Sequence, residues 1–295
     1  MLTNELGLPK PFVDAVTSDY QYKPKRYSVT DLLGGTCAAV LKRRHANEGS
    51  EDVSDMLWVI LGSAVHKVLE DSEAEGDQRQ EYHMVVDLDR GYQLSGIADL
   101  YTESTATVTD YKTCSTWKFT FGDFEEWRKQ TLLYCWMLRQ LGHRAEHGEI
   151  TAIMRDHNMR KARFEPEYPA HPVAKLSWDF SEGDLAEAES YVMEWFAEVR
   201  YQETLEDDFL EPCSDEQVWH KPDKWAVMRK GQKKAVKLFD SEDAALEFMD
   251  WLADQPSNKG KALYVEHRPG EDTRCQSYCP VAQWCPRGRK YFRES

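Results

Sequence analysis

The chain has 295 residues, 41% of them hydrophobic and 30% charged, which is the composition of an ordinary globular protein of one large or two small domains. Mean hydropathy is -0.69. The longest apolar run, Met56 to Leu61, is far shorter than the roughly 20 residues of a membrane span. With 37 basic and 52 acidic residues, the formal net charge of -15 excludes a surface that binds polyanions everywhere, but not a local basic groove. The start of the sequence lacks a secretory signal, so we expect a cytoplasmic protein, or one in the host cytoplasm if its source is viral.

The predicted elements run as helix, β-meander, helix and strand. Residues 1–26 hold three prolines and little periodicity, which predicts a loosely attached N-terminal arm. A helix is expected at 31–44, capped by Ser28 or Thr30, and another at 54–74, capped by Ser54 or Asp55. Residues 122–141 are expected to form an amphipathic helix and residues 181–204 a long surface helix. Strands are expected at 81–88, 92–101, 106–112 and 148–156. This order predicts an α/β (α+β) fold in which a mixed β-sheet is flanked by helices.

Three segments follow the arm. Residues 27–214 form the expected core. Residues 215–268 read as a small ββα insertion, in which WAVMRK pairs with AVKLF across the Lys230–Lys234 turn, SEDAALEFMDWLA forms a helix and ALYVEH returns as a strand. Residues 269–295 carry a cysteine motif.

The stretch SGIADLYTESTATVTDYKT, residues 95–113, is the most informative for function. Asp110 and Lys112 share one face of a strand, because side chains alternate along it. With Glu103-Ser104 as the turn, Asp99 lies opposite Val108 and diagonal to Asp110. Diagonal neighbours lie roughly 7–8 Å apart, so the two carboxylates can hold one divalent ion.

The preceding helix presents Gly62, His66 and Glu70 on one stripe. Gly62 is expected to let this helix approach another backbone closely. His66 is then placed to offer a nitrogen ligand to the same ion, although a buried, satisfied histidine is the alternative.

This set of residue types indicates phosphodiester hydrolysis. A hard cation held by Asp99 and Asp110 polarises a phosphate and lowers the pKa of a bound water. Lys112 neutralises charge that develops on the phosphorus centre. The alternative for a lone Asp-x-Lys is a solvated strand face, which the presence of His66 and Asp99 disfavours.

Four short motifs, in this order, resemble those of RecB-type nucleases in the PD-(D/E)xK superfamily. They are GSAVH (62–66), GIAD (96–99), DYK (110–112) and QTLLY (130–134). The resemblance implies a restriction-endonuclease-like core. It also implies that His66, Asp99 and Asp110 bind Mg²⁺ or Mn²⁺ and act in catalysis with Lys112. Much of the superfamily has glutamate at the position of Asp110. The RecB branch has aspartate there, as this chain does.

The same resemblance implies that Gln130 and Tyr134 border the site and contact substrate. They fall one helical turn apart. Their alternative is an ordinary amphipathic helix with a buried tyrosine.

Of seven cysteines, three lie close together in CQSYCPVAQWCP: Cys275, Cys279 and Cys285. In a reducing compartment this spacing favours a metal site over disulfides, and soft thiolates suit Zn²⁺ or an iron–sulfur cluster. Cys114, Cys135 and Cys213 are expected to be small core residues.

The fourth ligand is assigned by resemblance. CRISPR-associated iron–sulfur exonucleases and AddB-type nucleases place one cysteine before the histidine motif and three at the C-terminus, which implies Cys37 as the fourth ligand of a [4Fe-4S] cluster. The three-residue gap between Cys275 and Cys279 departs from the usual two. Such a clamp closes a loop of roughly 240 residues, worth on the order of 5 kcal/mol as an upper bound. Zinc at these cysteines is the main alternative.

The ββα insertion is basic. Lys221–Lys237 contains six lysines, one arginine and one aspartate, a local net charge of +6, with Trp219 and Trp225 beside or within it. Basic residues interleaved with aromatics suit contacts to a nucleic-acid backbone and its bases, so Lys230, Lys233 and Lys234 are expected to bind substrate. A solvated, charged hairpin is the alternative.

The sequence therefore predicts a metal-dependent DNA exonuclease acting on single strands or DNA ends. The resemblance implies a setting in recombination, DNA degradation or CRISPR-type adaptation, with the proteins of those processes as partners and no membrane. Two other classes remain as alternatives: a catalytically silent DNA-binding or scaffolding module on the same fold, and a zinc-stabilised interaction protein.

Overall fold

The computed structural model describes residues 2–17, 21–46, 48–49, 51–258 and 260–292. They form two compact units, unit 1 (Met1–Leu205) and unit 2 (Glu206–Ser295), which are described separately below. Residues 1 and 18–20 of the predicted arm and 293–295 of the predicted cysteine motif lie outside the described residues.

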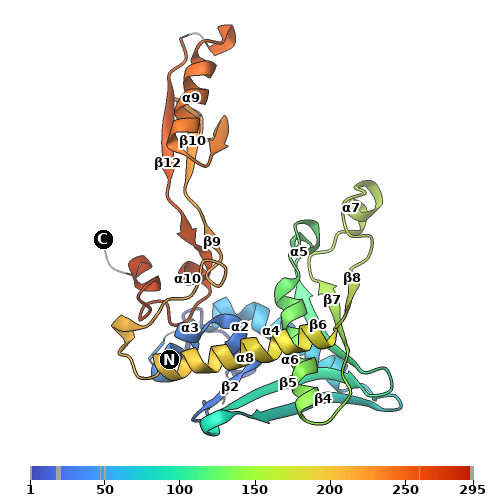
Figure 1. The fold of residues 1–295 in the computed structure, drawn as a ribbon. Coiled ribbons are helices and arrows are strands. Elements are labelled where there is room, and N and C mark those ends of the chain that lie inside the picture. The colour runs from blue at the N-terminus through green and yellow to red at the C-terminus, as the bar shows by residue number, and fades with distance from the viewer. Residues whose placement is uncertain (1, 18–20, 47, 50, 259, 293–295) are drawn as a thin grey trace. The chain divides into compact units, whose positions relative to one another are not determined.

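Unit 1 is built on a mixed six-stranded sheet (Figure 1). Its strands are β2 (Arg26–Ser28), β4 (Gln78–Asp87), β5 (Gln93–Thr102), β6 (Thr107–Cys114), β7 (His147–Met154) and β8 (Val173–Asp179). The order is β2-β5-β6-β7-β8, and β4 also pairs with β5. β2 runs parallel to β5 and β6 parallel to β7, whereas the other pairs are antiparallel. The predicted mixed sheet is confirmed.

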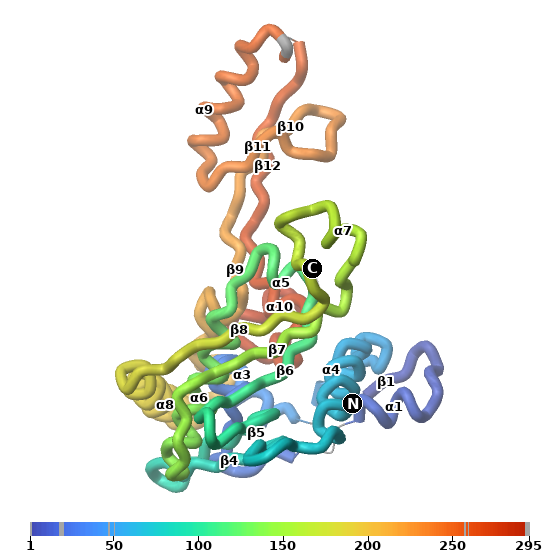
Figure 2. Tube along the Cα trace, turned by 90° about the vertical axis from the view of Figure 1, so that its right-hand side faces the viewer, coloured from blue at the N-terminus to red at the C-terminus, as the bar shows by residue number. Residues whose placement is uncertain are grey.

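Helices flank this sheet (Figures 1 and 2). The α-helices among the described residues of unit 1 are α1 (Lys10–Val16), α2 (Val29–Gly34), α3 (Thr36–Arg44), α4 (Leu57–Glu70), α5 (Trp117–Thr120), α6 (Glu125–Gln140), α7 (Met159–Phe164) and α8 (Glu182–Gln202). The predicted helix over 31–44 is two helices, because Gly35 takes a left-handed φ of 91° between them. A short parallel pair, β1 (Leu2–Thr3) with β3 (Glu51–Asp52), lies within the N-terminal part of unit 1.

Capping residues fix where two of these helices start. The side chains of Ser28 and Asp31 cap α2 reciprocally, and those of Ser181 and Asp184 do the same for α8. The core of unit 1 lies between the sheet and the helix layer, where α6 buries its entire stretch from Thr131 to Leu138. This burial holds α6 firmly against the strands that carry the predicted site.

Unit 2 contains the predicted ββα module. β10 (Lys224–Arg229) pairs with β11 (Lys237–Phe239) and β12 (Leu263–Arg268), and α9 (Glu242–Ala253) packs on them through a core that includes Val227 and Leu252. The predicted pairing of WAVMRK with AVKLF, the helix and the returning strand are all confirmed. β9 (His220–Lys221) pairs with β13 (Glu271–Asp272), which leads into α10 (Thr273–Ser277).

Asp272 is the polar centre of the cysteine-bearing end of unit 2. Its buried carboxylate accepts hydrogen bonds from Arg287 and pairs with His220 and Lys290. The Arg287 guanidinium holds the pKa of Asp272 well below its usual range. These contacts tie β13 to the C-terminal residues around Tyr291, whose hydroxyl accepts from the Asp272 backbone N–H.

No helix among the described residues is both long enough and apolar enough to cross a membrane.

Candidate active site

The strands that carry the predicted acidic residues separate where those residues lie. Within the described residues, β5 and β6 pair at Thr102↔Thr107, Tyr101↔Val108 and Leu100↔Thr109, so the next position sets Asp99 opposite Asp110. We call this position the fork. At the fork, a side chain takes the place of the backbone hydrogen bonds between the two strands: Asp99 Oδ2 accepts a 2.6 Å hydrogen bond from the Tyr111 backbone N–H.

The observed register corrects the sequence-based one by two residues. The prediction paired Asp99 with Val108, on the assumption of a two-residue turn. The connection instead takes four residues, 103–106, and Ala106 adopts a left-handed φ of 52°. A shift of two residues preserves which face each side chain occupies, so Asp99 and Asp110 remain neighbours.

His66 reaches the fork from α4. Its Nδ1 lies 3.3 Å from Asp99 Oδ1, and the ring meets Tyr111 edge-on with centroids 6.3 Å apart. The hydrogen bond with Asp99 raises the pKa of His66 above its ordinary value. The imidazole is about one-third exposed, at 37%, so it remains open to solvent ions.

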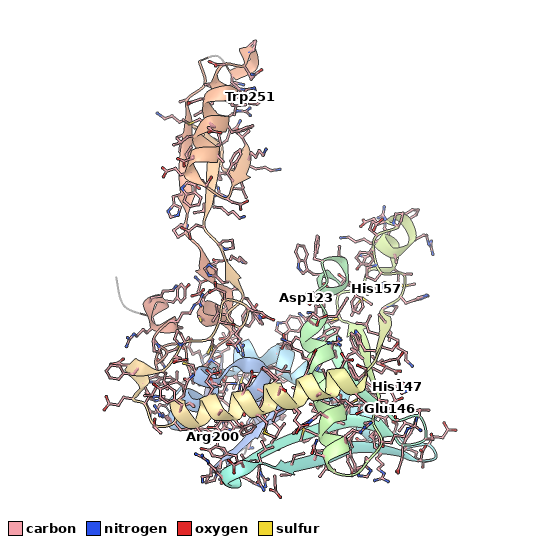
Figure 3. The ribbon with its side chains drawn as sticks, viewed as in Figure 1. Asp123, Glu146, His147, His157, Arg200 and Trp251 are labelled. Atoms are coloured by element: carbon pink, nitrogen blue, oxygen red, sulfur yellow. The ribbon has the colours of Figure 1, made fainter. Side chains whose placement is uncertain are left out.

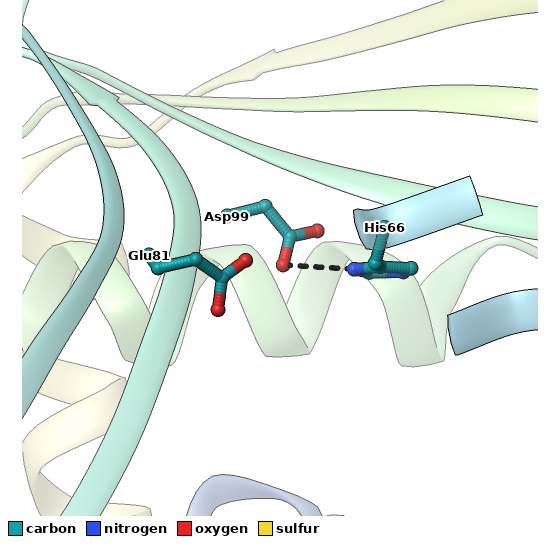
Figure 4. Close-up of side chains that lie close together, drawn as sticks. All are labelled: His66, Glu81 and Asp99. Carbon is teal, nitrogen blue, oxygen red and sulfur yellow. Dashed lines mark ion pairs between the residues drawn. The ribbon is translucent and has the colours of Figure 1, made fainter. Parts of the chain in front are cut away.

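Glu81 of β4 is a further candidate metal ligand beside His66 and Asp99, and the sequence analysis did not identify it (Figure 4). The ligand atoms of His66, Glu81 and Asp99 all lie within 4.8 Å of one another. One nitrogen and two carboxylates are a donor set that suits Mg²⁺ or Mn²⁺, so the residues present fit such an ion. Burial, and then the nearby charge of Asp99, raise the pKa of Glu81.

The pairing of β4 with β5 is what places Glu81 beside Asp99. Gln80 pairs with Leu100 and Tyr82 with Ala98, which sets Glu81 opposite Asp99. Recognising it from sequence needs the correct turn between β4 and β5, where the chain makes a three-residue 3₁₀ turn at Asp89–Gly91.

Asp110 and Lys112 form a second group on the other side of Asp99. Asp110 is 3% exposed, and its Oδ2 lies 2.7 Å from Lys112 Nζ. Burial raises the pKa of Asp110, while the charge of Lys112 opposes that shift and the charge of Asp99 adds to it. The four predicted catalytic residues, His66, Asp99, Asp110 and Lys112, therefore lie together.

Gln130 of α6 joins this group. Its Oε1 accepts a 2.7 Å hydrogen bond from Lys112 Nζ, and its Nε2 lies 3.0 Å from both Asp110 Oδ1 and the Tyr134 hydroxyl oxygen. Tyr134 is buried, and burial raises the pKa of its hydroxyl. Gln130 thus fixes the directions of Asp110 and Lys112, and Tyr134 supports Gln130 from one helical turn further on.

The charge balance of the fork favours a bound cation. Three carboxylates, those of Glu81, Asp99 and Asp110, lie together with the Lys112 ammonium and the His66 imidazole, and burial raises the pKa of Glu81 and of Asp110. Like charges held close together in a partly desolvated site oppose ionisation, and a divalent ion removes that opposition.

The cysteines lie in both units. In unit 2, Cys275 and Cys285 are buried and Cys279 is half-buried. Burial, and then the neighbouring thiols of Cys285 and Cys279, raise the pKa of Cys275 to about 12. Cys213, expected to be a small core residue, is half-buried and packs into this same cluster. In unit 1, Cys37 is buried in α3, and Cys114 and Cys135 are buried core residues as predicted.

The predicted basic residues of the insertion lie on the β10–β11 loop. Lys230, Lys233 and Lys234 are exposed there. Lys237 differs, because its ammonium lies over the rings of Phe239 and Phe248, at 5.0 and 5.2 Å from their centroids.

A mixed sheet flanked by helices, with carboxylates where two antiparallel strands part and a lysine two residues further on, is the arrangement of restriction-endonuclease-like nucleases. The family model of the PD-(D/E)XK nuclease superfamily matches residues 39–286, and the chain belongs to that superfamily. Its class is therefore that of a phosphodiester hydrolase with DNA as substrate, in a superfamily that typically uses Mg²⁺ or Mn²⁺.

The solved structures similar to this chain include two that differ in how much of the chain they cover. The crystal structure of SSO0001 is 18% identical with a TM-score of 0.42, covering 63% of this chain and 83% of that one. A phage-related exonuclease from Haemophilus somnus 129PT is 9% identical with a TM-score of 0.26, covering 56% of this chain and 94% of that one. No curated protein sequence matches the chain.

Proposed function

We propose that this protein is a RecB-like, metal-dependent DNA exonuclease that acts on single strands or DNA ends. The observation that carries the proposal is the meeting of His66, Asp99, Asp110 and Lys112 at one fork, in a chain of the PD-(D/E)XK superfamily. The resemblance of the four motifs to RecB-type nucleases supports the finer assignment, including a role in recombination, DNA degradation or CRISPR-type adaptation.

In this proposal the side chains divide into metal ligands and groups that act on the phosphate. His66, Glu81 and Asp99 hold the ion, with Asp110 as a further ligand from the opposite strand. A bound Mg²⁺ or Mn²⁺ supplies Lewis-acid polarisation of the phosphate and an acidified water. Lys112 offsets negative charge on the phosphate oxygens as the bond breaks. Gln130 keeps that ammonium and Asp110 in position.

Gln130 and Tyr134 are also proposed to border the substrate, and the exposed Lys230, Lys233 and Lys234 to contact backbone phosphates. Contacts between lysine ammonium groups and DNA phosphates are electrostatic, and they weaken as the salt concentration rises. They add affinity for any DNA sequence rather than choice among sequences.

The cysteines are proposed to hold a [4Fe-4S] cluster, with Zn²⁺ as the alternative. The ligands are Cys37, Cys275, Cys279 and Cys285. The nearness of the three C-terminal thiols within unit 2 supports the proposal, because grouped thiolates are soft ligands for iron or zinc. Its proposed role is structural.

The test is digestion of end-labelled single- and double-stranded DNA in Mn²⁺ or Mg²⁺. Removing Asp99 takes away a metal ligand, so Asp99→Ala is expected to abolish cleavage. Lys112→Ala removes a charge that acts on the developing oxyanion and is expected to slow cleavage by about 10²- to 10³-fold.

Two surface variants serve as matched controls. Asp179→Ala and Lys175→Ala remove an exposed aspartate and an exposed lysine of β8 from their ion pairs with His147 and Glu149 of β7, respectively. Both are expected to cleave at the wild-type rate. Full activity in both Asp99→Ala and Lys112→Ala would refute the site.

A further inference from the structure

The segments that follow β6 and β7 leave the sheet at the same end, because the two strands are parallel neighbours. They are joined there. The Arg155 backbone N–H donates to the Cys114 carbonyl at 2.9 Å, and the Thr116 N–H donates to Asp156 Oδ1 at 2.7 Å. Figure 3 marks this end of unit 1 by Asp123, which precedes α6, and His157, which precedes α7.

Large aromatic side chains are exposed at this end of the sheet. Trp117 and Phe121 are 66% and 63% exposed, and their rings lie against each other with centroids 3.8 Å apart and planes tilted by 36°. Between them, Phe119 turns inward and packs on the core cluster around Met154. The segment is thus anchored by one ring while it presents two others to solvent, which packing alone does not require.

A third exposed ring comes from α4. Trp58 is 56% exposed, and the Arg155 guanidinium lies 4.2 Å from its ring centroid. None of the residues 57–70 is fully buried, so this tryptophan does not serve a core of its own helix. We call Trp58, Trp117 and Phe121 the aromatic rim.

The segment that follows β7 is basic in its first half. Residues 155–163 contain Arg155, Arg160, Lys161, Arg163 and one aspartate, a net charge of +3 with histidine neutral, and Glu165 and Glu167 come after them. Lys118 of α5 adds a further cation, and its ammonium lies 5.0 Å from the Trp127 centroid. Aromatic faces next to guanidinium and ammonium groups complement a polyanion that carries planar bases.

The rim lies at the ends of elements that also carry the fork. Trp58 precedes His66 by eight residues of one helix, about 12 Å along its axis. Cys114 follows Asp110 by four residues of one strand, about 13 Å. These lengths correspond to roughly three or four nucleotides of a stacked strand.

We propose that the aromatic rim stacks on the bases of a single DNA strand while Arg155 and the basic residues of α7 hold its phosphates, leading the strand to the fork. This inference rests on the proposed nuclease function. A single strand is the occupant, because paired bases stack on each other inside a duplex and do not present their faces. Stacking on any base also gives binding without sequence preference.

The test compares two labelled strands of equal length and charge, oligo(dT) and an abasic deoxyribose-phosphate strand. Their binding is followed by fluorescence anisotropy in EDTA, which keeps the strands uncut. Trp58→Ala and the double variant Trp117→Ala/Phe121→Ala are expected to weaken oligo(dT) binding by about 5- to 100-fold and leave abasic binding unchanged. Trp58→Phe, which keeps a ring, is expected to retain most of the affinity.

Tyr201→Ala is the matched control, since Tyr201 is an equally exposed aromatic residue (55%) on α8 and is expected to have no effect. Equal wild-type affinity for both strands, or equal loss of both in the rim variants, would overturn the stacking role. A wild-type dimer that Trp58→Ala dissociates, with oligo(dT) binding intact, would assign the rim to self-association instead.

The two proposals fail in different ways. A wild-type protein that cleaves DNA in Mn²⁺ while its rim variants bind oligo(dT) normally refutes the rim alone. Ring-dependent oligo(dT) binding without cleavage in any metal refutes the proposed function and leaves the rim in place.

Discussion

One unusual backbone angle aims Glu81 at the fork. Its φ is +46°, in the left-handed region that costs a residue other than glycine on the order of 1–3 kcal/mol. The pairs on either side, Gln80↔Leu100 and Tyr82↔Ala98, hold the strand in register around it. Such strain persists only when the surroundings impose it, and it is often found at functional sites, which supports a role for this carboxylate in the metal site.

Glu81→Gln is predicted to weaken Mn²⁺ binding by at least about 10-fold, because an amide is a poorer ligand than a carboxylate and the site loses one negative charge. Isothermal titration of the DNA-free protein with Mn²⁺ measures this without reference to activity. The matched control is Glu70→Gln on α4, one turn beyond His66, where the carboxylate pairs with Lys67 at 3.4 Å.

Glu70→Gln is expected to weaken Mn²⁺ binding much less than Glu81→Gln does, because the Glu70 carboxylate acts on Glu81 through its charge alone. Equal affinity in Glu81→Gln and the wild type, with binding lost in Asp99→Ala, would exclude Glu81 as a ligand while leaving the site intact.

At the scale of elements, two motif glycines have different reasons to be glycine. A Cβ on Gly96 of β5 would lie 2.9 Å from Tyr134 Cε1 and 3.2 Å from Met137 Sδ, so Gly96 lets α6 pack closely on the sheet. Among the described residues, a Cβ on Gly62 of α4 would meet only Thr113 Oγ1, at an ordinary 3.7 Å. The expectation that Gly62 permits a close backbone approach is therefore wrong, and Gly96 has that role.

These contacts predict opposite stability changes for the same substitution. Gly96→Ala is expected to destabilise unit 1 by about 1–3 kcal/mol, because the new methyl group pushes on Tyr134. Gly62→Ala is expected to be neutral or to stabilise by up to about 1 kcal/mol, because alanine favours the helix. Urea unfolding measures both. A larger loss from Gly62→Ala than from Gly96→Ala would mean that α4 and α6 pack differently from the structure.

The helices and strands that could be predicted from the sequence are those with a clear pattern of apolar residues within their own segment. The stripe of α6 and the alternation of β5 and β6 are strong local signals. The missed elements depend on distant partners: β2 has three residues and exists through β5, and β8 exists through β7. The same reason explains the site. Asp99, Asp110, Lys112 and His66 follow from motif spacing, whereas Glu81 follows from the register of β4 on β5, which depends on the turn at Asp89–Gly91.

At the scale of the whole molecule, the proposed cluster ligands are divided between the two units, with Cys37 in unit 1 and the other three in unit 2. Cys275, Cys279 and Cys285 belong to unit 2, where Asp272 and Arg287 tie their segment to β9 and β13. A fourth ligand from Cys37 would link this segment to α3 of unit 1. A fourth ligand from Cys213 would keep the whole site within unit 2.

We predict that Cys37→Ser, in anaerobically purified protein, loses iron and broad visible absorption, because the resemblance to iron–sulfur nucleases implies Cys37 as the fourth ligand. Loss of this link removes the closure of a loop of roughly 240 residues, so unfolding is expected to become easier by up to about 5 kcal/mol. Cys135→Ser, at a buried core cysteine, is the control for a lost thiol and is expected to keep its iron. Iron lost from Cys213→Ser but kept by Cys37→Ser would assign the fourth ligand to Cys213, since that thiol already packs against Cys275, and the cluster would then stabilise unit 2 without joining it to unit 1.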